Sequence, residues 1–262
     1  MELEASPLLD LYDAVLIMTN NTTIGKDDLK RQSKMEAIDL FLQARAYLQS
    51  QNSNLFRAIS NYVTSPTDVD RHSDIICFLA NFTPGPVVLH VNDVVGYGLF
   101  AEKDYGNNEF VVEYGGVISD EELIGPYVIS VSRKRDLDGY FGFKLLQKGR
   151  FINEDHSKST FKTNAAMQKH LRNSANVVEE FTGQASVVFR TQKSWKYRLE
   201  KGSEILWYYG PNYRRPYLSL ECAVCKSKAE MTCGKCLSIM YCGNACANQD
   251  WYTHFKNECS FI

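Results

Sequence analysis

The chain has no uninterrupted apolar stretch near the roughly 20 residues needed to cross a bilayer, so we expect no membrane-spanning helix. It also lacks a strong charge of either sign, because 29 basic and 31 acidic residues leave a net charge of −2. With seven prolines and no concentrated basic face, the sequence offers little to nucleic acid, which we do not expect among the partners. Internal repeats and low-complexity tracts are absent, so the composition is that of an ordinary folded protein.

Before residue 222 the sequence has a single cysteine, Cys77. The other seven cysteines lie between residues 222 and 259. Their spacing is Cys222-x2-Cys225, Cys233-x2-Cys236, Cys242-x3-Cys246 and His254-x4-Cys259. Each pair brings two ligands together on a tight turn or one helix face, which is enough to hold two tetrahedral zinc ions. A disulfide cluster would need an oxidising compartment, and residues 1–21 have no secretory leader pattern. We therefore expect an intracellular zinc protein, nuclear or cytoplasmic.

These residues closely resemble the MYND zinc finger, in which Tyr241, Gln249 and Trp251 also have counterparts. The resemblance implies interleaved ligand sets. One zinc would be held by Cys222, Cys225, Cys242 and Cys246, and the other by Cys233, Cys236, His254 and Cys259. The last spacing is one residue longer than usual. A segment this short cannot bury a self-sufficient core, so metal binding must supply most of its folding energy, roughly 10–16 kcal/mol per site.

Apolar residues recur at helical spacing from Met35 to Val63 and predict two helices that end before Pro66. The short run Ile75–Leu79 fits either a buried strand or a helix turn. Residues 84–86, Pro-Gly-Pro, then break the chain, and we place a domain boundary there.

Beyond this break the pattern changes to short β-branched and aromatic segments separated by Gly and Asn or Asp turns. The predicted strands include Val87–Val91, Phe110–Tyr114, Tyr127–Val131 and Ser186–Thr191. We expect a helical region at 1–86, a mainly β domain at 87–217 and a small two-zinc module at 218–262, together an α+β protein.

Three segments stand out in the β region. The first is VGYGLFA at 95–101 together with FVVEYGGVI at 110–118, the second is GRFIN at 149–153, and the third is KGSEILWYYG at 201–210. A Gly-x-Gly pair alone fits a plain hairpin turn. In this order and at these separations, however, the segments resemble the SET domain of protein lysine methyltransferases over residues 87–213. The resemblance implies small β-sheets around a thread-through pseudoknot, with the asparagine and tyrosine motifs at one active site.

The implied activity is transfer of a methyl group from S-adenosylmethionine to a lysine amine of a protein or peptide, histone or non-histone. The implied cofactor-binding residues are Gly96, Tyr97, Gly98, Tyr127, Asn153 and Tyr209. The implied catalytic residues are Tyr209 and Tyr114, and Trp207 lies in the substrate channel. Glycines at 96 and 98 remove Cβ atoms that would keep the backbone from the cofactor. An aromatic channel beside a sulfonium lowers the pKa of the bound lysine, which frees its amine to attack.

The sequence departs from the SET pattern in several places. Asn153 is followed by Glu154-Asp155-His156 instead of the usual His-Ser-Cys. The distal asparagine is either Asn164 or Asn176, and we favour Asn176 because strand-like residues follow it. Residues 157–172 look inserted and form a candidate substrate-facing loop. Trp207 stands where Phe or Tyr is usual, and its larger ring predicts low methylation states. Because the finger follows directly, we hypothesise that it supplies part of the channel wall.

Other interpretations stay open. Tyr114 and Tyr127 lie on strand-like segments where tyrosine is a common core residue, and residues 207–209 fit a final buried strand equally well. The basic residues 133–135 fit a solvated loop. A catalytically weak SET scaffold would instead act as an adaptor whose MYND finger binds proline-containing peptides of partner proteins. The N-terminal helices either contact a partner or cap the sheet, and we favour the cap.

Overall fold

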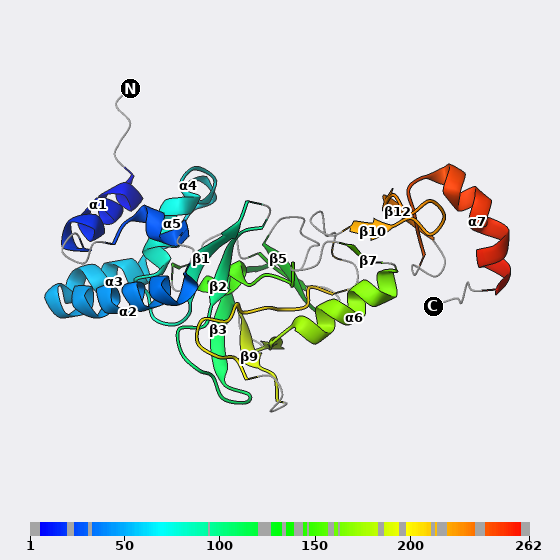
Figure 1. Cartoon of the computed structure of the whole chain (residues 1–262). Coiled ribbons are helices and arrows are strands. Elements are labelled where there is room, and N and C mark those ends of the chain that lie inside the picture. Colours follow the sequence, from blue (N-terminus) through cyan, green and yellow to red (C-terminus); the bar gives the residue numbers. More distant parts are fainter. Residues whose placement is uncertain are drawn as a thin grey trace, which may run out of the picture. The chain divides into compact units, whose positions relative to one another are not determined.

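The computed structural model describes residues 6–19, 24–30, 33–93, 95–119, 127–132, 135–138, 144–145, 147–156, 160–161, 163–182, 186–193, 198–210, 213, 219–233 and 239–257. Helices and small, mostly antiparallel sheets confirm the predicted α+β class (Figure 1). The chain divides into two compact units, Met1–Asn153 with Asn176–Ile205, and Glu154–Ala175 with Leu206–Ile262. This division by compactness does not test the domain boundaries predicted at residues 86 and 217. Those boundaries stay predictions, and so does the pseudoknot.

The first unit begins with helices. They are α1 (Pro7–Thr19), the 3-10 helix η2 (Lys26–Lys30), α2 (Lys34–Gln51), α3 (Ser53–Asn61), α4 (Pro66–Arg71) and α5 (Ser73–Ala80). The two helices predicted between residues 35 and 63 are confirmed as α2 and α3, which Asn52 separates by capping α3 through its side chain. The apolar run at 75–79 is the centre of α5, so the helical alternative is the correct one.

An aromatic cluster forms the core between α2 and α5. Phe41, Phe78 and Phe82 are fully buried, with ring centroids 5.1–6.1 Å apart. Burial of each such ring contributes about 1.5–3 kcal/mol. The guanidinium of Arg45 donates to the carbonyls of Asn81 (2.9 Å) and Gly85 (3.2 Å), which ties α2 to the chain break after α5.

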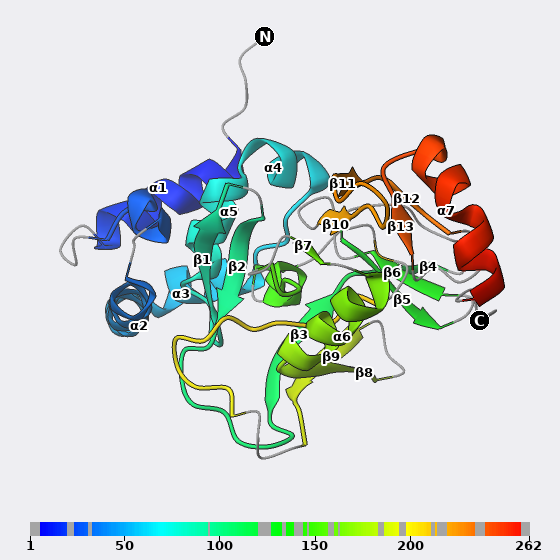
Figure 2. The same ribbon diagram turned by 45° about the vertical axis from the view of Figure 1, so that its right-hand side comes forward.

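The strands of the first unit form small sheets. Strand β1 (Val87–Asn92) pairs with β2 (Gly96–Phe100), and both α2 and α5 contact β1. A second sheet has the order β3 (Phe110–Gly115), β9 (Ser186–Thr191), β8 (Val177–Phe181), shown in Figure 2. A third has the order β4 (Val117–Ser119), β6 (Arg135–Asp138), β5 (Val128–Ser132). The predicted strands at 87–91, 110–114, 127–131 and 186–191 are thereby confirmed to within a residue or so at their ends.

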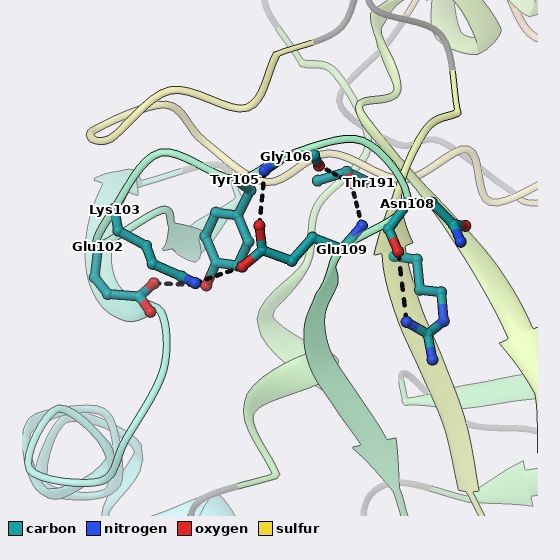
Figure 3. Close-up of polar contacts among 8 residues, drawn as sticks. Glu102, Lys103, Tyr105, Gly106, Asn108, Glu109 and Thr191 are labelled. Carbon is teal, nitrogen blue, oxygen red and sulfur yellow. Dashed lines mark hydrogen bonds and ion pairs between the residues drawn. The ribbon is translucent and has the colours of Figure 1, made fainter.

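Polar side chains close the loop that joins β2 to β3 (Figure 3). The carboxylate of Glu109 accepts from the backbone N–H of Gly106 at 2.7 Å, and the backbone N–H of Glu109 donates to the Thr191 hydroxyl of β9 at 2.9 Å. The N–H of Tyr105 donates to the carbonyl of Leu199 at 2.9 Å. The loop is thereby joined to β9 through Thr191 and, through Leu199, to the chain that immediately precedes the motif at 201–210.

The second unit contains short strands and two helices within the described residues. They are β7 (Thr160–Phe161), α6 (Asn164–Ser174), β10 (Ser219–Glu221), β11 (Lys228–Ala229), β12 (Met231–Thr232), β13 (Met240–Tyr241) and α7 (Asn244–Asn257). Strand β10 runs parallel to β7 and antiparallel to β11. Phe161, Met167 and Leu171 share one apolar cluster with Leu220 and Ala229. The segment that looked inserted therefore packs with the cysteine-rich tail.

Candidate functional site

The asparagine motif at 149–153 is held in place by backbone groups of other segments of the chain. It lies on the 3-10 helix η3 (Lys148–Phe151), which precedes Asn153. The fully buried Lys148 donates to the carbonyls of Thr83 (3.3 Å) and Pro86. A Cβ at Gly149 would lie 2.6 Å from the carbonyl oxygen of Glu113, so only glycine allows η3 to approach β3 this closely.

The side chain of Asn153 joins the first and third motifs. Its Nδ2 donates to the carbonyl of Tyr97 and to Oε1 of Glu204, each at 3.1 Å. A Cβ at Gly98 would lie 2.6 Å from Glu204 Oε1 and 2.9 Å from Asn153 Nδ2. In the described structure the space beside Gly98 is thus taken by protein side chains, a different reason for this glycine from the one expected. The cofactor roles of Gly98 and Asn153 stay predictions.

Gly96 and Tyr97 differ in their surroundings. Gly96 has φ +73°, which favours glycine, and no described atom lies within 4 Å of a Cβ built there. The hydroxyl of Tyr97 donates to the Asp74 carboxylate of α5. Burial and this hydrogen bond raise the pKa of Tyr97, which keeps the phenol neutral. The described structure therefore leaves open space beside Gly96, whereas the Tyr97 hydroxyl is bound to α5, and the cofactor roles of both residues stay predictions.

The turn at 201–204 pairs with the end of β2. The N–H of Ile205 donates to the carbonyl of Leu99 at 2.7 Å, and the N–H of Ala101 donates to the carbonyl of Ser203 at 2.9 Å. Nδ2 of Asn176 donates to the carbonyl of Glu204 at 2.8 Å. Of the two candidates for the distal asparagine, Asn176 lies in this network, while Asn164 begins α6 of the second unit.

Tyr114 and Tyr127 are brought together in the first unit. The Tyr114 hydroxyl donates to the carbonyl of Tyr127 at 2.6 Å, and the residue is 7% exposed. Its ring lies edge-on to Phe189, with centroids 6.2 Å apart. The guanidinium of Arg150, in η3, lies over the Tyr127 ring at 5.5 Å. The lysine-pocket role of Tyr114 and the cofactor role of Tyr127 stay predictions.

Tyr209 belongs to the second unit, where its ring contacts those of Trp207 and Tyr213. Its ring centroid lies 5.1 Å from that of Trp207 and 4.7 Å from that of Tyr213. Its backbone N–H donates to Oε1 of Glu154 at 2.9 Å, and Glu154 is 1% exposed. In the sequence, Glu154 stands out only as a departure from the SET pattern, and no local signal indicates this contact. Because Asn153 belongs to the other unit, the convergence of Tyr209 and Asn153 stays a prediction.

Four cysteines of the tail form a candidate metal centre. The sulfurs of Cys222, Cys225, Cys242 and Cys246 all lie within 4.8 Å of one another. The Sγ–Sγ distances from Cys242 to Cys225 and to Cys246 are both 3.5 Å. Tetrahedral thiolates about 2.3 Å from a zinc ion lie about 3.8 Å apart, so the set fits zinc.

The thiols of this set differ in acidity. Burial raises the pKa of Cys222, but backbone N–H donors, those of Cys225 and Cys242 first, outweigh it and lower that pKa to about 6. Hydrogen bonding to Cys242, together with burial, raises the pKa of Cys246 to about 12. Thiolates crowded in this way favour a soft divalent cation, which displaces the remaining protons.

The second predicted ligand set is only partly described. Cys233 and His254 are both buried, and His254 lies on α7. Cys236 and Cys259 lie outside the described residues. The second zinc stays a prediction.

Comparison with known proteins adds to the geometry. Residues 222–259 match the family model of the MYND finger. This segment is a MYND finger. The match confirms the interpretation of the tail from its sequence. Together with the cysteine cluster it supports a zinc-binding module. No curated protein matches the chain.

Two solved structures illustrate the structural similarities. One is a humanized mutant of the Chaetomium thermophilum Polycomb Repressive Complex 2 bound to the inhibitor GSK126, with 17% identity, a TM-score of 0.34 and coverage of 58% of this chain and 19% of that chain. The other is an active polycomb repressive complex 2 in the basal state, with 17% identity, a TM-score of 0.34 and coverage of 61% and 20%. The chain spans about a fifth of the length of these chains. Within its described residues, no helix combines the length and apolar character of a membrane span.

Proposed function

We propose that this chain is an S-adenosylmethionine-dependent protein-lysine N-methyltransferase that carries a C-terminal MYND finger. One observation carries the proposal: three motif segments, distant in sequence, are hydrogen-bonded to one another in the first unit. Asn153 of the second segment bonds Tyr97 of the first and Glu204 of the third. The SET resemblance requires such a meeting of segments, and neither composition nor a common β-hairpin would produce it.

The residues present fit the cofactor. When bound, S-adenosylmethionine would supply a methyl group on a sulfonium, which a lysine amine attacks in line. The open backbone at Gly96 offers a contact surface to such a ligand, and the side-chain amide of Asn153 offers a hydrogen-bonding group. The residues that we propose hold it are Gly96, Tyr97, Gly98, Tyr127, Asn153 and Tyr209.

The lysine pocket would be aromatic. We assign its walls to Tyr114, Trp207 and Tyr209, with the Tyr209 hydroxyl orienting the amine. Aromatic walls remove water from the amine and so lower the pKa of the lysine, which makes the neutral nucleophile available. The bulk of Trp207 limits how many methyl groups the pocket admits.

The finger would serve recognition and structure. We propose that it binds two zinc ions and a short proline-containing peptide of a partner or substrate protein. Two aromatic side chains of α7, Trp251 at 50% exposure and Tyr252 at 68%, offer apolar area to such a peptide. The second candidate function, an adaptor without catalysis, is favoured by the fact that the family match covers the finger alone. Nuclear or cytoplasmic location remains part of the proposal.

Two measurements separate enzyme from adaptor. Calorimetric titration with S-adenosylhomocysteine, the demethylated cofactor, should give saturable binding for an enzyme and none for an adaptor. Incubation with isotope-labelled S-adenosylmethionine and a protein array should then label lysines of a substrate. Tyr209→Phe is the matched control, because it keeps the ring but loses the hydroxyl. We expect this variant to bind cofactor and to lose methyl transfer, and an equally active variant would contradict the assignment of Tyr209.

A further inference from the structure

Both N–H groups of the Asn153 amide are directed at atoms that can only accept. One acceptor is the backbone carbonyl of Tyr97 and the other is the carboxylate of Glu204, each 3.1 Å from Nδ2. Neither can donate to the amide oxygen, so turning the amide over would place three acceptors against one another. The network therefore fixes which end of the amide faces Glu204.

Backbone hydrogen bonds fix the position of Glu204. Its carbonyl accepts from Asn176 Nδ2 at 2.8 Å, and the next residue, Ile205, bonds the carbonyl of Leu99 at 2.7 Å. The absence of a Cβ at Gly98 provides the space that its carboxylate occupies. The negative charge of Glu204 also acts on Lys34 at the start of α2, where it opposes the lowering of the lysine pKa by burial.

The N-terminal helices contribute to the same arrangement. The ammonium of Lys201 bonds the Asp39 carboxylate of α2, and a Cβ at Gly202 would lie 2.2 Å from the sulfur of Met35. Gly202 has φ +86°, so the turn needs glycine twice over, for its backbone and for the approach of α2. These contacts place the turn, and the turn places Glu204.

We propose that Glu204 is a positioning residue that holds the Asn153 amide so that its oxygen accepts a hydrogen bond from a donor group of the bound ligand. No hydrogen bond to that oxygen occurs within the described part of the chain. The ligand group must then be an N–H or O–H. S-adenosylmethionine carries such groups on its amino, adenine and ribose moieties. The identity of the ligand rests on the proposed function, whereas the contact between Glu204 and Asn153 does not.

Two variants form a matched pair. Glu204→Gln keeps an acceptor oxygen at the same chain length, and Glu204→Met has a similar length without any acceptor. Neither changes the Glu204 carbonyl, so the side-chain amide of Asn176 is an internal control in the same protein. Thermal unfolding of both variants shows whether the fold is retained. Should Glu204→Met not fold, Gly98→Ala disturbs the same contact, because its Cβ would lie 2.6 Å from the carboxylate oxygen.

The first readout needs no ligand. Proton exchange with solvent is measured by NMR at the Nδ2 groups of Asn153, identified by their loss in Asn153→Ser, and of Asn176. Because Asn153 loses a hydrogen bond to a charged acceptor in Glu204→Met, its amide protons should exchange about tenfold or more faster than in the natural protein. In Glu204→Gln the exchange at Asn153 should be slower than in Glu204→Met. The exchange at Asn176 should not change in either variant. Unchanged exchange at Asn153 in Glu204→Met overturns the proposal.

The second readout is calorimetric affinity for S-adenosylhomocysteine. We expect it to weaken about tenfold or more in Glu204→Met and to recover largely in Glu204→Gln. Equal affinities of the two variants would overturn the link between the amide and the ligand. If the natural protein binds no S-adenosylhomocysteine, the methyltransferase proposal fails, and the amide exchange still decides whether Glu204 positions Asn153.

Discussion

The carboxylate of Glu154 accepts a hydrogen bond from the backbone N–H of Tyr209, with Oε1 and N 2.9 Å apart, although 55 positions separate the two residues. Glu154 is the first residue after Asn153, at the position where the SET pattern would have histidine. Both residues belong to the second unit, where this buried carboxylate holds the backbone of the tyrosine motif.

Glu154→Leu removes the acceptor and leaves the Tyr209 N–H without this partner. Removing one partner from a buried hydrogen bond costs about 1–3 kcal/mol of unfolding free energy, while Glu154→Gln retains an oxygen acceptor and should cost less. Urea denaturation of the two variants measures the difference. A Leu variant as stable as the Gln variant would show that the bond contributes nothing to the fold.

Zinc content tests the finger directly. Metal analysis of the natural protein should give two equivalents, and Cys246→Ser should remove at least one and loosen the tail, because zinc binding supplies most of its folding energy. Cys77→Ala, outside the finger, is the control and should leave the metal content unchanged. A natural protein with a single equivalent would refute the second ligand set.

Some elements of the fold and of the candidate site could be predicted from the sequence, and others could not. The helices around Phe41 and the strands around Val87 could be predicted, because burial imposes periods that are visible in the residues themselves. The pairs Cys222–Cys225 and Cys242–Cys246 could be predicted from their close spacing along the chain, whereas their joining in one set was implied by the resemblance to the MYND finger. Asn176 was favoured over Asn164 from its place before a strand, and it is the one that bonds Glu204.

The roles of Glu154, Glu204 and Lys148 could not be predicted. Each is an ordinary charged residue in its local context, and each acquires its role from a partner more than 50 positions away. Local sequence patterns do not predict contacts between residues so far apart in the chain. One signal is present in the sequence: a glycine at position 98 is consistent with close packing against the backbone, although it does not identify the side chain that packs there.

The buried Lys148 predicts a pH dependence of stability. Burial, with the nearby charge of Arg45, lowers its pKa well below the usual value of 10.5 in the folded protein. Between the folded and unfolded pKa values the unfolded chain binds more protons, so unfolding free energy rises with pH in that window, by at most about 1.4 kcal/mol per pH unit. Lys148→Met should flatten this rise.

Urea denaturation at several values from about pH 7 to about pH 10 measures both slopes. Lys193→Met, which removes an exposed lysine of the same unit, is the matched control and should retain the natural slope. Parallel curves for the natural protein and Lys148→Met would mean that the amine keeps its proton equally well in both states.

Trp207 supplies the last prediction, which concerns the product of the proposed reaction. Its ring centroid lies 5.1 Å from that of Tyr209, and we propose that the two rings line one wall of the lysine pocket. Trp207→Phe shortens this wall and enlarges the proposed lysine pocket, and we expect the product to shift from mono-methyl-lysine toward di- and trimethyl-lysine. Mass spectrometry of a methylated substrate measures the distribution, and Trp207→Tyr, with an intermediate ring, should fall between. Abundant trimethyl-lysine from the natural protein would refute the role of Trp207, because its indole would then leave room for every methyl group.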